Sequence, residues 1–154
     1  MSVVRARSSV SSSSSPSPSL LPRSAEELVA SARRSLTEAS IASTAHERYA
    51  AAHLAALRAA AAVLAVRGRP SGSRSRVVSA WVLLPRCAPE LGEWATFFAA
   101  GARKRASAEA GVACVSVREA DDLVRDAGSF LSQVCHLIGV PDQIAMGSTL
   151  LHVG

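Results

Sequence analysis

Aromatic residues are scarce in this 154-residue chain, at 4% of the total. The six are Tyr49, Trp81, Trp94, Phe97, Phe98 and Phe130. Hydrophobic residues still make up 49% of the chain, and much of that share is alanine, whose side chain fills little volume. The length suits a single domain. A core built this way is thin, so it must depend on close contact between secondary-structure elements.

Cysteine is also rare, with only Cys87, Cys114 and Cys135. The odd number argues against a disulfide framework and favours a reducing, cytoplasmic location. The cysteines share no metal-ligand spacing, and none of the four histidines lies near them in a zinc-binding pattern. We therefore expect neither a metal nor another cofactor.

Lysine is almost absent, because Lys104 stands against sixteen arginines. The net charge of +5 permits binding to a polyanion without requiring it. Together with the abundant alanine, the preference for arginine is typical of a biased genomic base composition.

Acidic residues are missing before Glu26, where residues 1–23 are rich in serine and proline. This segment lacks the apolar block of a secretory signal and the periodicity of a transit peptide, so we expect a disordered tail. Two-residue alternation typical of strands does not outcompete helical spacing anywhere, although Val112 to Val117 is β-branched. Residues 140–154 also look irregular.

The clearest positive feature is residues 44–67, which predict one long helix. Thr44 and Glu47 have the spacing of a capping box, and Gly68 is the first breaker. Alanine is the strongest helix former, and apolar residues recur at helical spacing. An 18-residue stretch here is almost long enough to cross a membrane, but Arg58 lies near its centre. We expect a buried helix and no membrane partner.

Two further capping boxes open helices. Ser24 with Glu27 begins one that runs to about Ala39, and Ser116 with Glu119 begins another that runs to about Ile138. A final Gly and Pro, at positions 139 and 141, stop the second of these.

The segment between these helices is less regular. Residues 79–84 predict a short helix interrupted by Pro85, and Pro89 suits the start of another. Gly101 either ends that later helix or is carried through it. We expect it to bury four residues: Leu91, Trp94, Phe97 and Phe98. The pattern as a whole predicts an all-α, antiparallel bundle of four to five helices over residues 24–139.

Three segments resemble an actinobacterial family of small HEPN-domain proteins. They read HERYAAAHLAALRAAAAVLAVR, SAWVLLPRCAPELGEWATFFAAGARKRASAEAG and SVREADDLVRDAGSFL. The resemblance covers about residues 24–139 and implies a helical bundle that commonly dimerises. It leaves function open, because many HEPN proteins are RNases whereas others have lost activity and only bind. Small-residue faces beyond what one chain can cover also favour a homodimer.

The resemblance implies a candidate catalytic pair, Arg48 and His53. Active HEPN enzymes place an Arg and a His, separated by four to six residues, at a dimer cleft and need no metal. A histidine is suited to general acid–base chemistry, and a guanidinium to holding phosphate oxygens. Here, however, Tyr49 stands where those enzymes usually carry a small polar residue, and the pair lies on the second helix rather than a later one. Five residues also turn about 140° around a helix, so a joint site would need the partner chain.

A structural role for the same two residues is the alternative. His53 then packs across a helix seam beside Tyr49, and Arg48 either extends to solvent or pairs with Asp121 or Asp122.

Two basic clusters are candidates for RNA binding, and both flank the tryptophans and phenylalanines that could stack on bases. They comprise Arg67, Arg69, Arg74, Arg76, Arg103, Lys104 and Arg105. Solvated charges beside a purely structural aromatic core are the alternative interpretation. The sequence therefore favours a dimeric helical module that binds RNA or protein without chemistry. The competing hypothesis is a metal-independent endoribonuclease that uses Arg48 and His53.

Overall fold

The computed structural model describes residues 24–68, 79–112 and 114–142, and these residues fold as a helical bundle without a strand. The elements are α1 (Ala25–Ile41), α2 (Ala45–Arg67), α3 (Ala80–Cys87), the 3-10 turn η2 (Pro89–Leu91), α4 (Gly92–Glu109) and α5 (Val117–Ile138). The predicted all-α bundle is confirmed. The expected N-terminal tail, and all but the first residues of the C-terminal one, lie outside the described residues.

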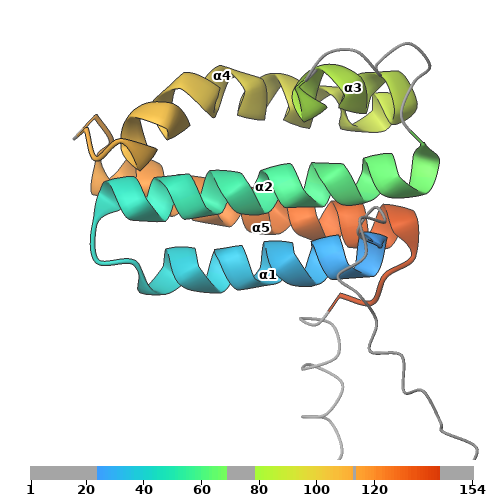
Figure 1. The fold of residues 1–154 in the computed structure, drawn as a ribbon, viewed down its shortest axis with the longest axis horizontal. Coiled ribbons are helices and arrows are strands. Elements are labelled where there is room, and N and C mark those ends of the chain that lie inside the picture. Colours follow the sequence, from blue (N-terminus) through green and yellow to red (C-terminus); the bar gives the residue numbers. More distant parts are fainter. Residues whose placement is uncertain (1–23, 69–78, 113, 143–154) are drawn as a thin grey trace, which may run out of the picture.

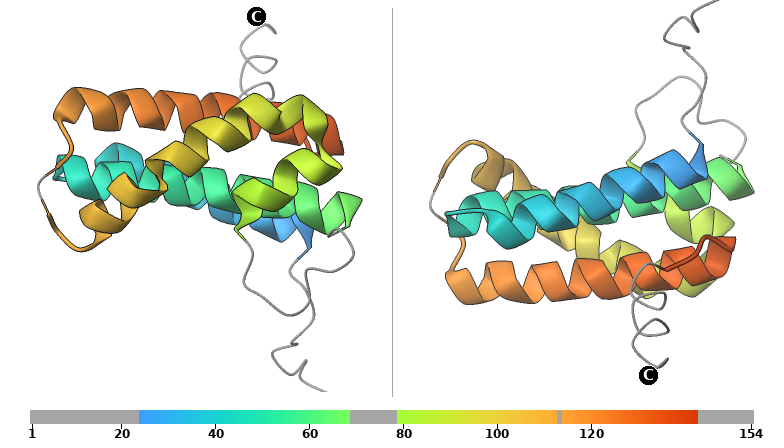
Figure 2. Two further views of the ribbon diagram at one scale, coloured as in Figure 1. Left: turned by 90° about the horizontal axis from the view of Figure 1, so that it is seen from above. Right: turned by 90° about the horizontal axis from the view of Figure 1, so that it is seen from below.

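Helix α2 is the central element, as Figure 1 shows. It contacts each of the other four α-helices, and its most extensive backbone contact is with the antiparallel α1. Helices α3 and α4 lie across the opposite face of α2, and α4 crosses it obliquely (Figure 2). Helix α5 runs beside α2 and also contacts α1. Opposite faces of α2 are thus covered by different neighbours.

The predicted helix starts are largely confirmed. Complete capping boxes form at Ser24 and at Ser116, where each hydroxyl and a glutamate three residues later satisfy amides reciprocally. At Thr44 only the hydroxyl half forms, accepting from the Glu47 amide at 3.3 Å. Gly139 ends α5 with a φ of +74°, a left-handed conformation that glycine adopts without strain.

Two expectations for the middle of the chain need correction. Pro85 does not interrupt α3, which continues to Cys87. The burial of Trp81 and Leu84 on α3 outweighs the single backbone hydrogen bond that a proline cannot donate. Phe97 was expected to be buried and is instead 45% exposed, because Phe98 points into the core in its place. Gly101 is carried through α4, one of the two options left open.

Most of the buried residues of α2 are alanines. The residues with no exposed surface on this helix include Ala52, Ala55, Ala56, Ala59, Ala60 and Ala62. The single chain therefore already covers the small-residue face that favoured a dimer. A homodimer is no longer needed to cover these alanines, and self-association stays a prediction.

One described helix, α2, is long and apolar enough to cross a membrane. More than half of that stretch is buried inside the bundle. The Arg58 guanidinium also donates to the Ser31 carbonyl and the Ser35 hydroxyl of α1. The burial and the polar contact both fit a central bundle helix.

Candidate functional site

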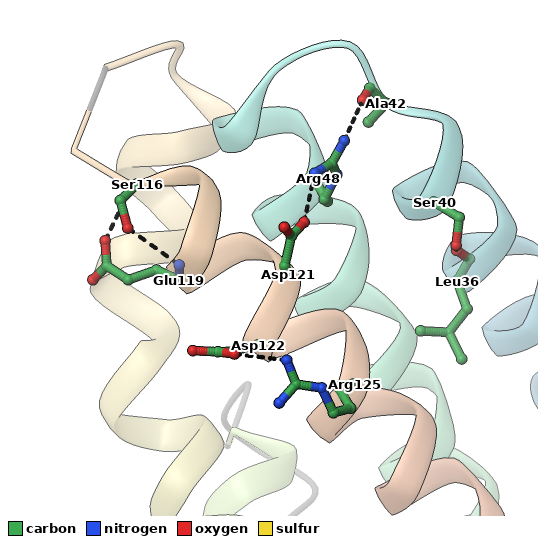
Figure 3. A network of polar contacts seen from close by, with 9 residues as sticks. All are labelled: Leu36, Ser40, Ala42, Arg48, Ser116, Glu119, Asp121, Asp122 and Arg125. Carbon is green, nitrogen blue, oxygen red and sulfur yellow. Dashed lines mark hydrogen bonds and ion pairs between the residues drawn. The ribbon is translucent and has the colours of Figure 1, made fainter.

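Arg48 lies in the first turns of α2, where its guanidinium has partners on both sides. One terminal nitrogen, Nη1, lies 2.5 Å from the Asp121 carboxylate on α5. The other, Nη2, donates to the Ala42 carbonyl in the α1–α2 link at 3.1 Å. Figure 3 shows the side chain between these two partners. The arginine thus ties three segments together, and of the alternatives considered for a structural role the pairing with Asp121 is the one observed.

His53 lies in the core, with 1% of its surface exposed. Its Nε2 is 2.8 Å from the Phe98 carbonyl oxygen of α4. Because a carbonyl can only accept, Nε2 carries the proton and donates. The rings of Trp81 and Phe98 pack edge-on against the imidazole, with centroids 5.8 and 5.9 Å away.

The surroundings of His53 favour a neutral ring. Burial lowers the pKa of His53, and the nearby Arg105 guanidinium lowers it further, whereas the hydrogen bond to Phe98 opposes this change. The other nitrogen, Nδ1, is buried and has no hydrogen-bond partner among the described residues. A buried neutral imidazole packed among aromatic rings is placed to stabilise a helix crossing.

Arg48 and His53 therefore reach different parts of the fold. The first bonds to α5 and the α1–α2 link near the start of α2, and the second bonds to α4 inside the core. A single chain does not bring the two side chains to a common surface cleft.

Most described residues of the basic clusters are held in ion pairs. Arg67 contacts Glu90 at 2.6 Å, Lys104 contacts Glu119 at 2.5 Å, and Arg105 contacts Glu109 at 2.7 Å. Arg103 is exposed. The remaining candidates, Arg69, Arg74 and Arg76, lie outside the described residues. Pairing with carboxylates leaves less positive charge available for phosphates than the sequence suggests.

The Lys104–Glu119 pair also belongs to the N-terminal cap of α5. The Lys104 ammonium, followed by the Ser116 amide and hydroxyl, holds the pKa of Glu119 at about 2. In Figure 3 the Ser116–Glu119 cap lies on the same helix end as Asp121. These acidic residues therefore serve helix ends and ion pairs, and no group of three metal-ligating side chains forms within residues 24–68, 79–112 and 114–142.

The aromatic residues divide into a buried and an exposed set. Trp81, Phe98 and Phe130 are buried and pack on one another, with the Phe98 and Phe130 centroids 5.2 Å apart. Trp94 is half-buried, and its Nε1 donates to the Gln133 side chain at 2.6 Å. Phe97 lies beside it on the surface. Of the rings considered for base stacking, only Trp94 and Phe97 reach solvent.

Those two rings line a hollow between α4 and α5 that sequence reasoning missed. Its other lining residues are Glu93, Asp126 and Gln133. Gln133 also lines a neighbouring hollow against η2. The helical spacing did not indicate that Phe97 would be exposed, because either of two adjacent phenylalanines could lie on the buried face of the helix. The two acids, 33 residues apart in sequence, gave none either.

The fold and this surface can be set beside known proteins. A family model described as SAV_6107-like HEPN matches residues 39–135, which span α2 to α5. No curated protein and no solved structure matches the chain.

Proposed function

The chain belongs to the SAV_6107-like HEPN family, and from that premise we propose that it is a non-catalytic helical module that binds another protein. The observation that carries the proposal is the position of His53, sealed in the core with its N–H donated to the Phe98 carbonyl. A general acid or base must reach the reacting oxygen directly or through one water. His53 meets neither condition in this conformation.

Arg48 supports the same conclusion. A guanidinium that stabilises phosphate charge needs free donors directed at the substrate. The terminal nitrogens of Arg48 are already bound to Asp121 and to Ala42. Substrate would have to displace a carboxylate that neutralises the cation.

A protein partner is favoured over RNA by the charges. Carboxylates pair with Arg67, Lys104 and Arg105, so most of the candidate cations that lie within the described residues are already neutralised. By contrast, Phe97 on α4 is 45% exposed and lies beside the half-buried Trp94. Exposed apolar surface beside polar residues is typical of protein interfaces.

An RNA cleavage assay tests the absence of chemistry. The full chain is incubated with total RNA in EDTA, beside His53→Ala and Arg48→Ala, with Arg125→Ala as the control for losing a surface arginine paired to an aspartate. We expect no cleavage by any of the four. Cleavage by the wild type and by Arg125→Ala, with loss in folded Arg48→Ala and His53→Ala, would instead establish the metal-independent endoribonuclease. Circular dichroism identifies any variant that has unfolded.

An RNA-binding titration separates the two kinds of partner. Labelled single-stranded RNA is titrated with the chain at increasing salt concentrations, and we expect weak binding at physiological ionic strength. Tight binding that falls steeply with salt and is lost in Arg103→Glu would favour RNA as the partner. Size-exclusion chromatography coupled to light scattering measures the molar mass of the chain in solution and so shows whether it forms a homodimer.

A further inference from the structure

The surface between α4 and α5 consists of two adjoining hollows, which we name together the α4–α5 groove. One is lined by Trp94, Phe97 and neighbouring acids, the other by Leu91 and Leu137 among others, and Gln133 belongs to both. Their volumes are about 450 and 440 Å³. Each hollow therefore contains large apolar residues, and the polar Gln133 lies where the two meet.

The groove exists because aromatic rings hold the two helices apart. The backbones of α4 and α5 make almost no close approach within the described residues. Phe130 of α5 instead meets Trp94 and Phe98 of α4 at centroid distances of 5.6 and 5.2 Å. Large side chains separate helix axes, and the space beyond their outer edge stays open. The floor is also firm, because Gln133 of α5 fixes the Trp94 indole.

The floor of the hollow at Trp94 carries exposed aromatic surface of the kind that protein-binding sites use. Phe97 is 45% exposed and lies edge-on to Trp94, with ring centroids 6.1 Å apart. An exposed phenylalanine beside a half-buried tryptophan offers a large contact area that is rigid before binding. Residues of this kind carry much of the binding energy at protein interfaces.

The rim of the groove is acidic in a chain that is basic overall. Seventeen lysines and arginines outnumber twelve acids in the sequence, yet neither hollow is lined by a lysine or an arginine. Three carboxylates line it instead: Glu90, Glu93 and Asp126. Glu90 is paired with Arg67, whereas Glu93 and Asp126 form no ion pair within the described part of the chain. This charge repels a polyanion and complements a cationic partner.

We propose that the α4–α5 groove receives a basic amphipathic helix of a partner protein. Two helices with a gap between them offer a third helix a place for apolar residues at i, i+3 or i+4, and i+7. Along α5 the groove runs from Asp126 to Leu137, a rise of about 16 Å, which a partner helix of about three turns matches. Aliphatic or aromatic residues of that helix cover Trp94 and Phe97, and its lysines or arginines face Glu93 and Asp126. This inference rests on the proposed function and names its partner class and its surface.

Three dye-labelled 18-residue peptides test the proposal against the full chain by fluorescence anisotropy. The first carries leucine, one tryptophan and lysine in an amphipathic helical pattern. The second has the same composition in scrambled order, and the third replaces each lysine with glutamate. We expect the first to bind at least about tenfold more tightly than either of the others, because only it matches both the floor and the rim.

Variants of the chain locate the binding. Phe97→Ala and Glu93→Lys are expected to weaken the first peptide about tenfold or more. Val82→Ala and Glu26→Lys remove an exposed apolar residue and reverse an exposed acid elsewhere, and they are expected to change affinity less than about twofold. All four changes lie on the surface, so the fold should survive.

Three results would overturn the proposal. They are equal binding of the three peptides, equal effects of groove and control variants, and a homodimer of the chain that Phe97→Arg converts to a monomer. The last would assign the groove to a second copy. A failure of the proposed function is seen separately, in RNA cleavage or salt-sensitive RNA binding. If the chain neither cleaves nor binds RNA and the groove does not bind the first peptide, the proposed protein-binding function would stand, with the partner bound at another surface.

Discussion

Two halves of the bundle are packed by opposite means. Between α1 and α2 most of the buried residues are alanine and serine, and the two helices share the most extensive backbone contact in the fold. Between α4 and α5 it is made by tryptophan and phenylalanine, and the backbones stay apart. The central helix α2 thus packs closely against α1 on one side and faces the cluster of aromatic rings on the other. Small side chains let the helix backbones approach closely, whereas large ones keep the backbones apart and leave a groove beside them.

The comparison predicts that the aromatic side carries the larger single contributions to stability. Truncating a buried phenylalanine removes apolar contact and leaves a cavity. We expect Phe98→Ala to lower the free energy of unfolding by about 3–5 kcal/mol, measured by urea denaturation. Phe97→Ala, next in sequence and half exposed, should cost less than about 1.5 kcal/mol. Phe98→Leu replaces Phe98→Ala if the latter does not fold, and equal costs at the two positions would contradict the comparison.

On the alanine side the expected failure is overpacking. Ala62 lies one turn after Arg58 on the face that meets α1, and it has no exposed surface. We expect Ala62→Leu to lower the free energy of unfolding by about 1–3 kcal/mol, because the close seam has no space for the added atoms. The exposed Ala99→Leu on α4 is the control and should be almost neutral. A neutral Ala62→Leu would mean that the seam is loose.

The alanine seam also contains a polar contact. The Arg58 guanidinium donates to the Ser35 hydroxyl at 2.5 Å, and Ser35 has no exposed surface. Arg58→Met keeps the aliphatic stem and should lower the free energy of unfolding by about 1–3 kcal/mol, because it leaves buried oxygens unpaired. Adding Ser35→Ala to Arg58→Met should recover part of the loss in the same urea experiment. No recovery would show that Arg58 acts through its stem alone.

The sequence predicted where the helices begin and end better than how they pack on one another, for a physical reason. Helix starts and stops depend on residues three or four positions apart, so the capping boxes at Ser24 and Ser116 could be predicted from the sequence. The pairing of Arg48 with Asp121 was also within reach, because opposite charges on two predicted helices suggest a contact.

The candidate site was less accessible to sequence reasoning. Which of two adjacent phenylalanines points inward is decided by how α4 crosses its neighbours, and local spacing does not contain that angle. Pro85 was misjudged because its cost is local, whereas the burial of Trp81 that overrides it is tertiary. The α4–α5 groove joins residues from separate helices and appears only once both helices are placed.

His53 lies where the central helix meets the aromatic side, and it should make that side sensitive to acid. Burial lowers the pKa of His53 in the folded state below the value of 6.5 for a free side chain. Between the two values the unfolded chain binds the extra proton, so acid favours unfolding. Stability should be fully present above about pH 6.5 and fall as the pH drops, at no more than about 1.4 kcal/mol per pH unit from this residue.

The measurement is the urea midpoint between pH 7.5 and pH 5 for the wild type and for His53→Gln. Glutamine offers an N–H in place of Nε2 but does not titrate, so the variant should show a flatter dependence over this window. Glu119, whose pKa is held at about 2, loses its stabilising effect only at lower pH, as the pH falls from 4.5. An unchanged slope in His53→Gln would show that the imidazole is not the group responsible.

The smallest expected effect concerns the point where α4 crosses α2. A Cβ at Gly101 would lie 2.9 Å from the Tyr49 hydroxyl, whereas a Cβ at Gly128 in α5 would meet nothing within 4 Å. Alanine is the better helix former, so Gly128→Ala should stabilise the chain by about 0.5–1 kcal/mol. At Gly101 the same gain is opposed by the contact, and we expect no gain or a loss of about 1 kcal/mol. Adding Tyr49→Phe removes the obstructing oxygen, so Gly101→Ala should then stabilise relative to Tyr49→Phe alone, a coupling that urea denaturation of the four proteins measures. If Gly101→Ala stabilises equally with and without the tyrosine hydroxyl, the crossing is not as close as the structure places it, and glycine is there for no packing reason.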